Sequence, residues 1–185
     1  SIAGPNSRKV LEKIVRDDVS NEKFKFRDSR RMFVGGVPAI INRISFTGEL
    51  GYEIYVAPHY QLKLYEELME AGKEFNIKPF GGRALMSMRL EKNWGAWTLD
   101  YRPDFTAKET GLDAFINWDK EFIGKESAQK ENSSNKLVPL IVETNEIDVT
   151  NNEAVMNGDQ SIGYVTSGGF APVSYTHLTL PTILR

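Results

Sequence analysis

The sequence predicts an α+β protein, and three kinds of pattern lead to that prediction. Residues 6–15 and 58–72 repeat apolar side chains at three- and four-residue intervals, the spacing of one helix face. Residues 43–56 alternate apolar and polar side chains on both sides of a glycine-containing segment, which indicates strand, tight turn and strand. Residues 137–170 hold short apolar runs separated by Asn-Gly and similar turn residues, a pattern typical of a small β-barrel.

The composition is that of an ordinary globular protein. The 185 residues contain 41% hydrophobic and 26% charged side chains, and the net charge of −2 gives no electrostatic argument for binding nucleic acid or an acidic membrane. The chain has no cysteine and only two histidines, His59 and His177, which argues against a metal site and against a Ser-His-Asp triad. We find no transmembrane run or signal peptide, and we expect a cytoplasmic protein.

The N-terminal region predicts a short apolar run, a Gly-Pro turn and a helix. Asn6 or Ser7 is expected to cap this helix, because both side chains accept hydrogen bonds from the free N–H groups of a first turn. A polar loop with Asp17 and Asp18 follows. Adjacent carboxylates in such a loop are far more often solvated than paired for acid–base chemistry, so we assign them no catalytic role.

Residues 43–56 are the most informative segment. Gly48 and Gly51 bracket its turn, which predicts a positive φ or the close approach of another part of the chain. Such a turn presents Glu49 or Glu53 from a stiff support. The residues by themselves leave two interpretations open, a carboxylate that contacts a ligand and a hairpin with two solvated glutamates.

Two helices are predicted after this segment. Residues 58–72 form the first, which opens with a Pro-His-Tyr turn, and a glycine-rich turn at 80–82 leads into the second. Arg83 lies in the first turn of the second helix, where a cation opposes the macrodipole. A bound anion, also favoured by free backbone N–H groups at a helix start, and a tertiary salt bridge explain this placement equally well.

Large aromatic side chains are concentrated after the second of these helices. Trp94, Trp97 and Tyr101 lie within eight residues. Two interpretations are equally open: the rings stack against a flat heterocyclic ligand, or they line a core or an interface. Residues 107–116 predict a turn and a strand, and residues 119–128 predict a loop and a short helix.

A resemblance to a known family begins at residues 47–53, which read TGELGYE. This run resembles the pterin-contacting segment of the aminomethyltransferase (glycine-cleavage T-protein) superfamily, and residues 3–7, AGPNS, resemble a helix start of the same domains. The resemblance implies a T-protein-like folate-binding fold in which Glu53 hydrogen-bonds the pterin of tetrahydrofolate. The family usually has Tyr at the position of Phe46, so the aromatic face is kept here without the hydroxyl.

Further motifs narrow the resemblance. Arg83 matches an arginine of the family's folate site, and residues 89–91 match a motif whose charged pair is mostly structural there. A stand-alone T-protein normally has Tyr-Gly-x-Asp after that motif, whereas residues 94–97 read WGAW. The chain is most similar to the C-terminal folate-binding part of dimethylglycine and sarcosine dehydrogenases, through the runs MRLEK (88–92), DYRP (100–103), TGLDAF (110–115) and FIGK (122–125).

The resemblance implies a tetrahydrofolate-binding, one-carbon-transfer domain of an FAD-dependent dimethylglycine or sarcosine dehydrogenase-like enzyme. Such a domain captures the one-carbon unit released from an N-methylated glycine as methylenetetrahydrofolate. The alternatives are a stand-alone aminomethyltransferase of glycine cleavage, a non-catalytic folate-binding module, and a structural domain that no longer binds folate. The family's catalytic aspartate and the flavin domain would precede Ser1, so we expect a fragment without a catalytic residue.

Three segments are expected along the chain. Residues 1–130 resemble the folate-binding domain without its N-terminal part, and residues 136–172 resemble the start of a C-terminal β-barrel. The intervening residues 130–135 have the polar composition of a linker. Residues 173–185 are expected to be a non-native tail, because the resemblance to the barrel stops abruptly there.

Overall fold

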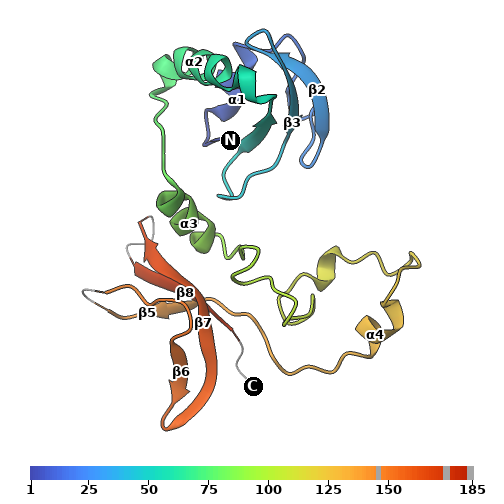
Figure 1. Cartoon of the computed structure of the whole chain (residues 1–185), viewed down its shortest axis with the longest axis vertical. Helices are drawn as coiled ribbons and strands as arrows, with labels where there is room; N and C mark the ends of the chain where they lie inside the picture. Colours follow the sequence, from blue (N-terminus) through green and yellow to red (C-terminus); the bar gives the residue numbers. More distant parts are fainter. Residues whose placement is uncertain (145–146, 173–175, 183–185) are drawn as a thin grey trace. The chain divides into compact units, whose positions relative to one another are not determined.

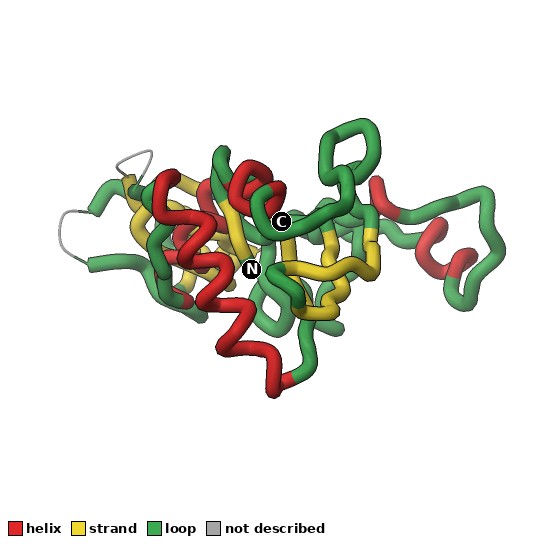
Figure 2. Tube along the Cα trace, turned by 90° about the horizontal axis from the view of Figure 1, so that it is seen from above, coloured by secondary structure: helices red, strands yellow, loops and turns green. Residues whose placement is uncertain are grey.

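The computed structural model describes residues 1–144, 147–172 and 176–182 and divides the chain into two compact units, Ser1–Leu85 and Met86–Arg185 (Figure 1). Each unit contains an antiparallel sheet of four strands, and helices accompany both sheets. Figure 2 shows the same chain coloured by helix, strand and loop. The α+β prediction is therefore confirmed.

The sheet of the first unit has the strand order β1-β4-β3-β2. Its strands are β1 (Ile2–Ala3), β2 (Ser29–Val34), β3 (Val37–Asn42) and β4 (Gly51–Tyr55). A two-residue turn at Gly35 and Gly36 joins β2 to β3, and the φ angles of the two glycines are +57° and +77°. Two consecutive positive φ angles match the right-handed twist of a hairpin, which explains why two glycines occupy this turn.

The strand–turn–strand prediction for residues 43–56 is wrong in its first half. β4 forms as expected, but β3 already ends at Asn42, and residues 43–50 form a loop. The alternation around Ile44 and Phe46 does not produce a strand because loop residues bond to distant parts of the chain. The Arg43 guanidinium, for example, donates to the carbonyl oxygen of Phe24.

Both glycine predictions for this loop are confirmed. Gly48 has a φ of +74°. Gly51 lies so close to its neighbours that a Cβ there would be 2.9 Å from the Cβ of Ser45. The end of the loop is tied to the N-terminal segment, because the Leu50 carbonyl oxygen accepts a hydrogen bond of 2.9 Å from the Ser7 hydroxyl.

Helices α1 (Ser7–Glu12) and α2 (Gln61–Gly72) cover one face of this sheet, the inner face (Figure 1). A 3-10 turn, Pro58–Tyr60, precedes α2, and another, Lys73–Phe75, follows it. The core between helices and sheet consists of buried apolar side chains: Leu11, Val19, Phe24, Met32, Val34, Ala39, Ile41, Tyr52 and Leu64.

Two details of the predicted helices differ from the structure. Asn6 takes the N-cap position of α1 without a side-chain cap bond, and the Ser7 hydroxyl bonds to Leu50 instead. On α2, Leu64 is buried and Leu68 packs against the core, whereas Leu62 and Tyr65 are exposed. On a helix with 3.6 residues per turn, Leu62 lies about 160° around the axis from Leu64, and Tyr65 lies about 100° from it, at the edge of the buried face. The buried stripe is therefore narrower than the apolar repeat of residues 58–72 predicts.

The second unit contains a sheet of order β5-β8-β7-β6. Its strands are β5 (Leu140–Val142), β6 (Ala154–Asn157), β7 (Gln160–Ala171) and β8 (Thr176–Thr182). The predicted Asn-Gly turn joins β6 to β7, and Gly158 there has a φ of +59°. The segment that the sequence predicts to start a β-barrel therefore forms strands of an antiparallel sheet.

The remaining helices belong to the connecting segments. α3 (Gly82–Glu91) contains the boundary between the two units, and α4 (Lys125–Lys130) is the predicted short helix. A long loop connects α3 to α4 (Figure 1). The predicted strand at 107–116 is wrong, because this segment forms turns and a 3-10 helix, Asp113–Phe115, closed by local backbone hydrogen bonds.

Part of the predicted non-native tail is a strand. β8 pairs with both β5 and β7. Residues 173–175 and 183–185 of that prediction lie outside the described residues. The non-native origin of the tail, like the boundaries expected for the three segments, stays a prediction.

Candidate functional site

Glu53 lies on β4 and points to the face of the sheet opposite the helices, which we call the outer face. Its Cα partner is Asn42 on β3, while the neighbouring Tyr52 and Ile54 point toward the core. The carboxylate is half-buried and accepts a hydrogen bond from the Tyr55 hydroxyl. This hydrogen bond raises the pKa of Tyr55 above its usual value. Glu53 is therefore a positioned carboxylate on a strand.

Phe46 lies in the loop 43–50 and is half-buried. The loop is internally bonded, because the hydroxyl groups of Ser45 and Thr47 lie 2.9 Å apart and Thr47 is buried. Phe46 is thus presented by an ordered loop that leads directly into the strand of Glu53.

Arg83 is exposed in the first turn of α3, as the sequence predicts. Within the described residues, the Arg83 guanidinium has no hydrogen bond or ion pair, so the structure offers no tertiary salt bridge to explain its position. Among those same residues, no bond or ring contact joins Glu53, Phe46 and Arg83. The structure therefore places each of the three predicted site residues individually, and their membership of one binding site stays a prediction.

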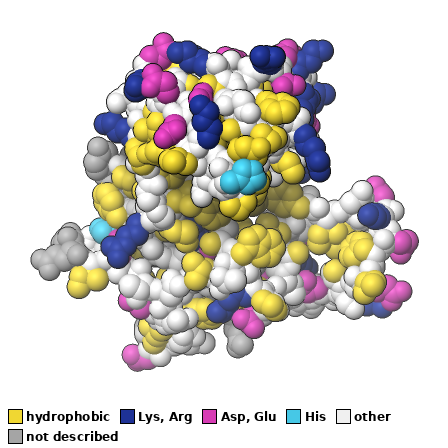
Figure 3. Space-filling view, turned by 45° about the horizontal axis from the view of Figure 1, so that its top comes forward, with side chains coloured by type: hydrophobic (Ala, Val, Ile, Leu, Met, Phe, Trp, Pro, Cys, Tyr) yellow, Lys and Arg dark blue, Asp and Glu magenta, His cyan; other side chains and the backbone are white. Residues whose placement is uncertain are grey.

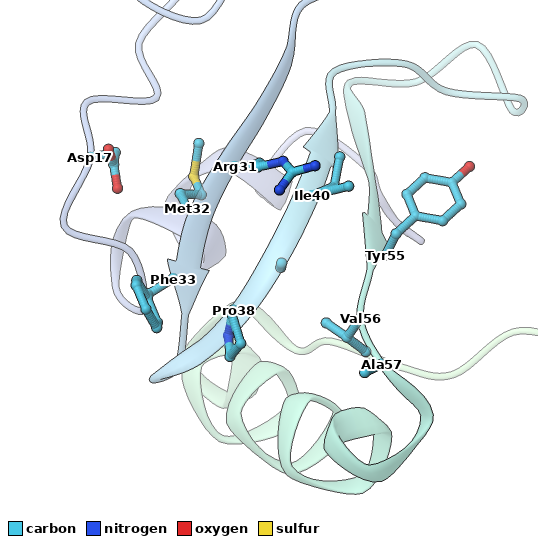
Figure 4. Close-up of a pocket in the computed structure, with 10 residues that line it drawn as sticks. Asp17, Arg31, Met32, Phe33, Pro38, Ile40, Tyr55, Val56 and Ala57 are labelled. Atoms are coloured by element: carbon cyan, nitrogen blue, oxygen red, sulfur yellow. The ribbon is translucent and has the colours of Figure 1, made fainter.

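The outer face also carries a shallow pocket that the sequence analysis missed. It has a volume of about 630 Å³ and lies across β2, β3 and β4. Figure 4 shows Arg31 extending over β3 toward Ile40 and Tyr55 projecting from β4. The signal was present in the alternation of β2 and β3, since Phe33 and Ile40 are apolar at positions that point away from the core.

Arg89 forms a buried ion pair in the second unit. Its guanidinium lies 2.6 Å from the Asp100 carboxylate and donates to the Ser167 hydroxyl at 2.7 Å and to the Trp94 carbonyl oxygen at 3.1 Å. Asp100 also accepts from the backbone N–H of Ala96 at 2.8 Å. These bonds connect α3, the tryptophan-rich loop and β7, which confirms the structural role expected for Arg89.

The aromatic cluster has one buried and two exposed members. Tyr101 is buried, and the rings of Trp94 and Trp97 meet it edge-on with centroid distances of 6.0 Å and 5.7 Å. Trp97 is 78% exposed, and Trp94 also packs edge-on against Phe115 at 6.1 Å. Tyr101 thus belongs to a local core, whereas the tryptophans present ring surface to solvent.

Other candidate centres have simpler explanations. Asp17 and Asp18 are exposed, and a hydrogen bond from Ser20 lowers the pKa of Asp18, as expected of a solvated turn. His177 lies 2.6 Å from Asp148, and no serine hydroxyl bonds to His177 in the described part of the chain. The described residues include no group of three His, Cys, Asp or Glu side chains placed to bind a metal ion.

Hydrophobic and charged side chains are mixed on the surface (Figure 3). On the face drawn in Figure 3, hydrophobic side chains lie among charges of both signs, which agrees with the net charge of −2. None of the helices in the described residues combines the length and hydrophobicity that a membrane crossing requires.

Comparison with known proteins decides the family. Residues 1–120 match the model of the GCVT N-terminal domain. The chain belongs to the GCVT N-terminal domain family. This result confirms the family resemblance seen in the TGELGYE and Arg-Leu-Glu motifs.

Proteins similar to this GCVT-domain chain include both dimethylglycine dehydrogenases and aminomethyltransferases. It is 36% identical to human mitochondrial dimethylglycine dehydrogenase over 92% of its own length and 20% of that protein. It is 34% identical to an aminomethyltransferase of Caldanaerobacter subterraneus over 99% of its own length and 50% of that protein. The chain therefore spans about a fifth or about half of these relatives.

A solved structure supports the fold. The glycine cleavage system aminomethyltransferase T from Bartonella henselae matches with a TM-score of 0.71 and 23% sequence identity, over 79% of this chain and 42% of that one. The expected T-protein-like fold is thereby confirmed.

Proposed function

We propose that the chain is the tetrahydrofolate-binding, one-carbon-transfer domain of a dimethylglycine or sarcosine dehydrogenase-like enzyme. In this proposal a flavin domain elsewhere in the protein oxidises an N-methylated glycine. The folate domain then captures the one-carbon unit as methylenetetrahydrofolate. The single observation that carries the folate assignment is Glu53, a half-buried carboxylate on the outer face of a rigid sheet, within the family's TGELGYE motif.

The chemistry of Glu53 suits a pterin. The amino group and ring N–H at the pterin edge need a hydrogen-bond acceptor, and an ionised carboxylate offers two oxygens with about four acceptor positions. The Tyr55 hydroxyl uses one of these positions and orients the carboxylate. The remaining positions are available to a ligand. Phe46 and Arg83 are proposed to contact the same folate, by their match to the family's motif positions.

Calorimetric titration of the 185-residue chain with 5-formyltetrahydrofolate tests the proposal. Because a hydrogen bond to a charged group contributes about 1.5–3 kcal/mol, Glu53→Gln should weaken binding by roughly tenfold to a hundredfold. Glu49→Gln is the matched control, because it removes the other glutamate of the same motif and should leave affinity unchanged. Absence of binding by the folded wild-type chain, or equal binding by Glu53→Gln, would contradict the proposal.

The second candidate is a stand-alone aminomethyltransferase. The match over 99% of this chain to such an enzyme favours it, whereas WGAW at residues 94–97 favours the dehydrogenase branch. Expression of the complete gene product separates them. A bound flavin that dimethylglycine or sarcosine bleaches supports the dehydrogenase, and a flavin-free protein that acts on an aminomethylated lipoyl carrier supports the aminomethyltransferase.

A further inference from the structure

The outer face of the first sheet brings a cation into the same surface as Glu53. The strand register aligns Arg31 on β2, Ile40 on β3 and Tyr55 on β4 in one row across the sheet. The next row contains Asn42 and Glu53. Arg31 and Glu53 therefore lie two strands and two residues apart, which corresponds to a Cα separation of about 12 Å.

The Arg31 side chain is available to a ligand. It is exposed and lines the pocket on the outer face, and its guanidinium has no ion pair, hydrogen bond or ring contact within the described ranges. Asp17 lines the same pocket without forming an ion pair with it. By contrast, the guanidinium of Arg30, the preceding residue, donates to the backbone carbonyl oxygen of Lys23 and packs over the Phe24 ring.

Apolar surface separates the two charged groups. Ile40 is 39% exposed and lies beside Arg31 in Figure 4, and the line from Glu53 to Arg31 crosses β3 between Ile40 and Asn42. Tyr55 and Phe33 add exposed ring surface at the same pocket. The face therefore presents a hydrogen-bond acceptor, then an apolar strip, then a cation. The complementary ligand has a donor-rich heterocycle at one end, a flat ring in the middle and a carboxylate at the other end.

We infer that Arg31 binds the glutamate carboxylates of the reduced folate, with the aminobenzoyl ring lying over Ile40. This inference rests on the proposed function, because it takes the pterin to be at Glu53. Arginine suits the task, since its planar guanidinium forms two parallel hydrogen bonds to a carboxylate. Arg31 thereby contributes to selecting the folate over free pterins, which lack the anionic tail.

The test compares two ligands that differ only in tail charge, 5-formyltetrahydrofolate and its glutamate dimethyl ester. Calorimetric titration should show that the wild-type chain binds the free acid roughly three to ten times more tightly than the diester. Arg31→Gln should lower affinity for the free acid to that of the diester and leave the diester unaffected. Lys63→Gln is the matched control, because it removes an exposed cation from α2, on the other side of the sheet.

The outcomes separate the inference from the proposed function. Equal affinity of the wild-type chain for both ligands, or a preference for the free acid that survives Arg31→Gln, would overturn the role of Arg31 while leaving the folate assignment intact. Failure of the wild-type chain to bind either ligand would overturn the folate assignment, and the role of Arg31 with it. If Arg31→Gln bound both ligands more weakly by the same factor, Arg31 would stabilise the sheet without contacting the carboxylates, which would also overturn the inference.

Discussion

Charged side chains of family motifs occupy two very different environments in this molecule. Arg89 and Asp100 of the second unit are 1% and 0% exposed, and they bond to each other and to neighbouring protein atoms. Glu53 and Arg83 of the first unit reach solvent, and neither forms an ion pair among the described residues. Burial forces a charge to find its partner inside the protein, whereas an exposed charge on a rigid element is available to a ligand.

The largest expected effect comes from breaking the buried pair. Arg89→Met leaves the Asp100 carboxylate buried without its counter-ion, and it should lower the free energy of unfolding by about 3–5 kcal/mol. All three tryptophans lie in the second unit, so tryptophan fluorescence during urea unfolding reports on that unit. The double variant Arg89→Met, Asp100→Leu should recover much of the loss. If the single variant lost less than about 1 kcal/mol of unfolding free energy, the ion pair would contribute little to the stability of the second unit.

A smaller, pH-dependent effect is expected at Glu109. This residue is 8% exposed, and its carboxylate accepts hydrogen bonds from Ser133 and from the backbone N–H of Thr106. These hydrogen bonds, that of Ser133 first, lower the pKa of Glu109. The unfolded chain therefore binds the proton more readily, so the contribution to stability is complete above the unfolded pKa of about 4.3 and disappears as pH falls through the lower folded pKa.

Glu109→Gln should therefore flatten the dependence of unfolding free energy on pH in the acid range. Urea unfolding followed by tryptophan fluorescence at a series of pH values below neutrality measures this slope. Glu126→Gln provides the control, because Glu126 is exposed on α4. A slope that is the same in Glu109→Gln and in the wild type would show that these hydrogen bonds do not control acid stability.

Glu53→Gln should hardly affect stability. A half-buried side chain on a solvent-facing surface has few protein partners to lose, so the free energy of unfolding should change by less than about 0.5 kcal/mol. The same substitution is expected to reduce folate affinity strongly. Calorimetric melting of the chain measures the stability term, and a loss above about 2 kcal/mol would place Glu53 with Arg89 among the structural charges.

The smallest effect is expected at Arg83. A cation in the first turn of α3 opposes the helix macrodipole, so Arg83→Gln should raise the free energy of unfolding by about 0.3 kcal/mol. Raising the salt concentration should shrink this gain, because exposed charges are screened. The comparison of urea midpoints at low and high salt checks it. A destabilised variant would indicate that Arg83 has a protein partner after all.

Local chemistry made part of the fold predictable. Two glycines at 35 and 36 specify their turn, and the alternation in β4 specifies which of its side chains point inward, because neighbouring residues alone decide both features. Prediction failed where distant partners decide. Residues 43–50 form a loop that is hydrogen-bonded to Phe24 and Ser7. The Ser7 hydroxyl does not cap α1, because it donates to the carbonyl oxygen of Leu50, 43 positions away.

Adjacent residues alone were enough to indicate the family and to place Glu53 on a strand, because short motifs and a period of two are local properties of the chain. The Gly35-Gly36 turn sets the register of β2 against β3, but the addition of Tyr55 to the row of Arg31 and Ile40 depends on long-range packing, because a loop of eight residues separates β3 from β4 and leaves their register to the inner side chains. The tertiary structure also decided which motif charges are buried. The partner of Arg89 is an aspartate in another segment, and only folding brings the two together.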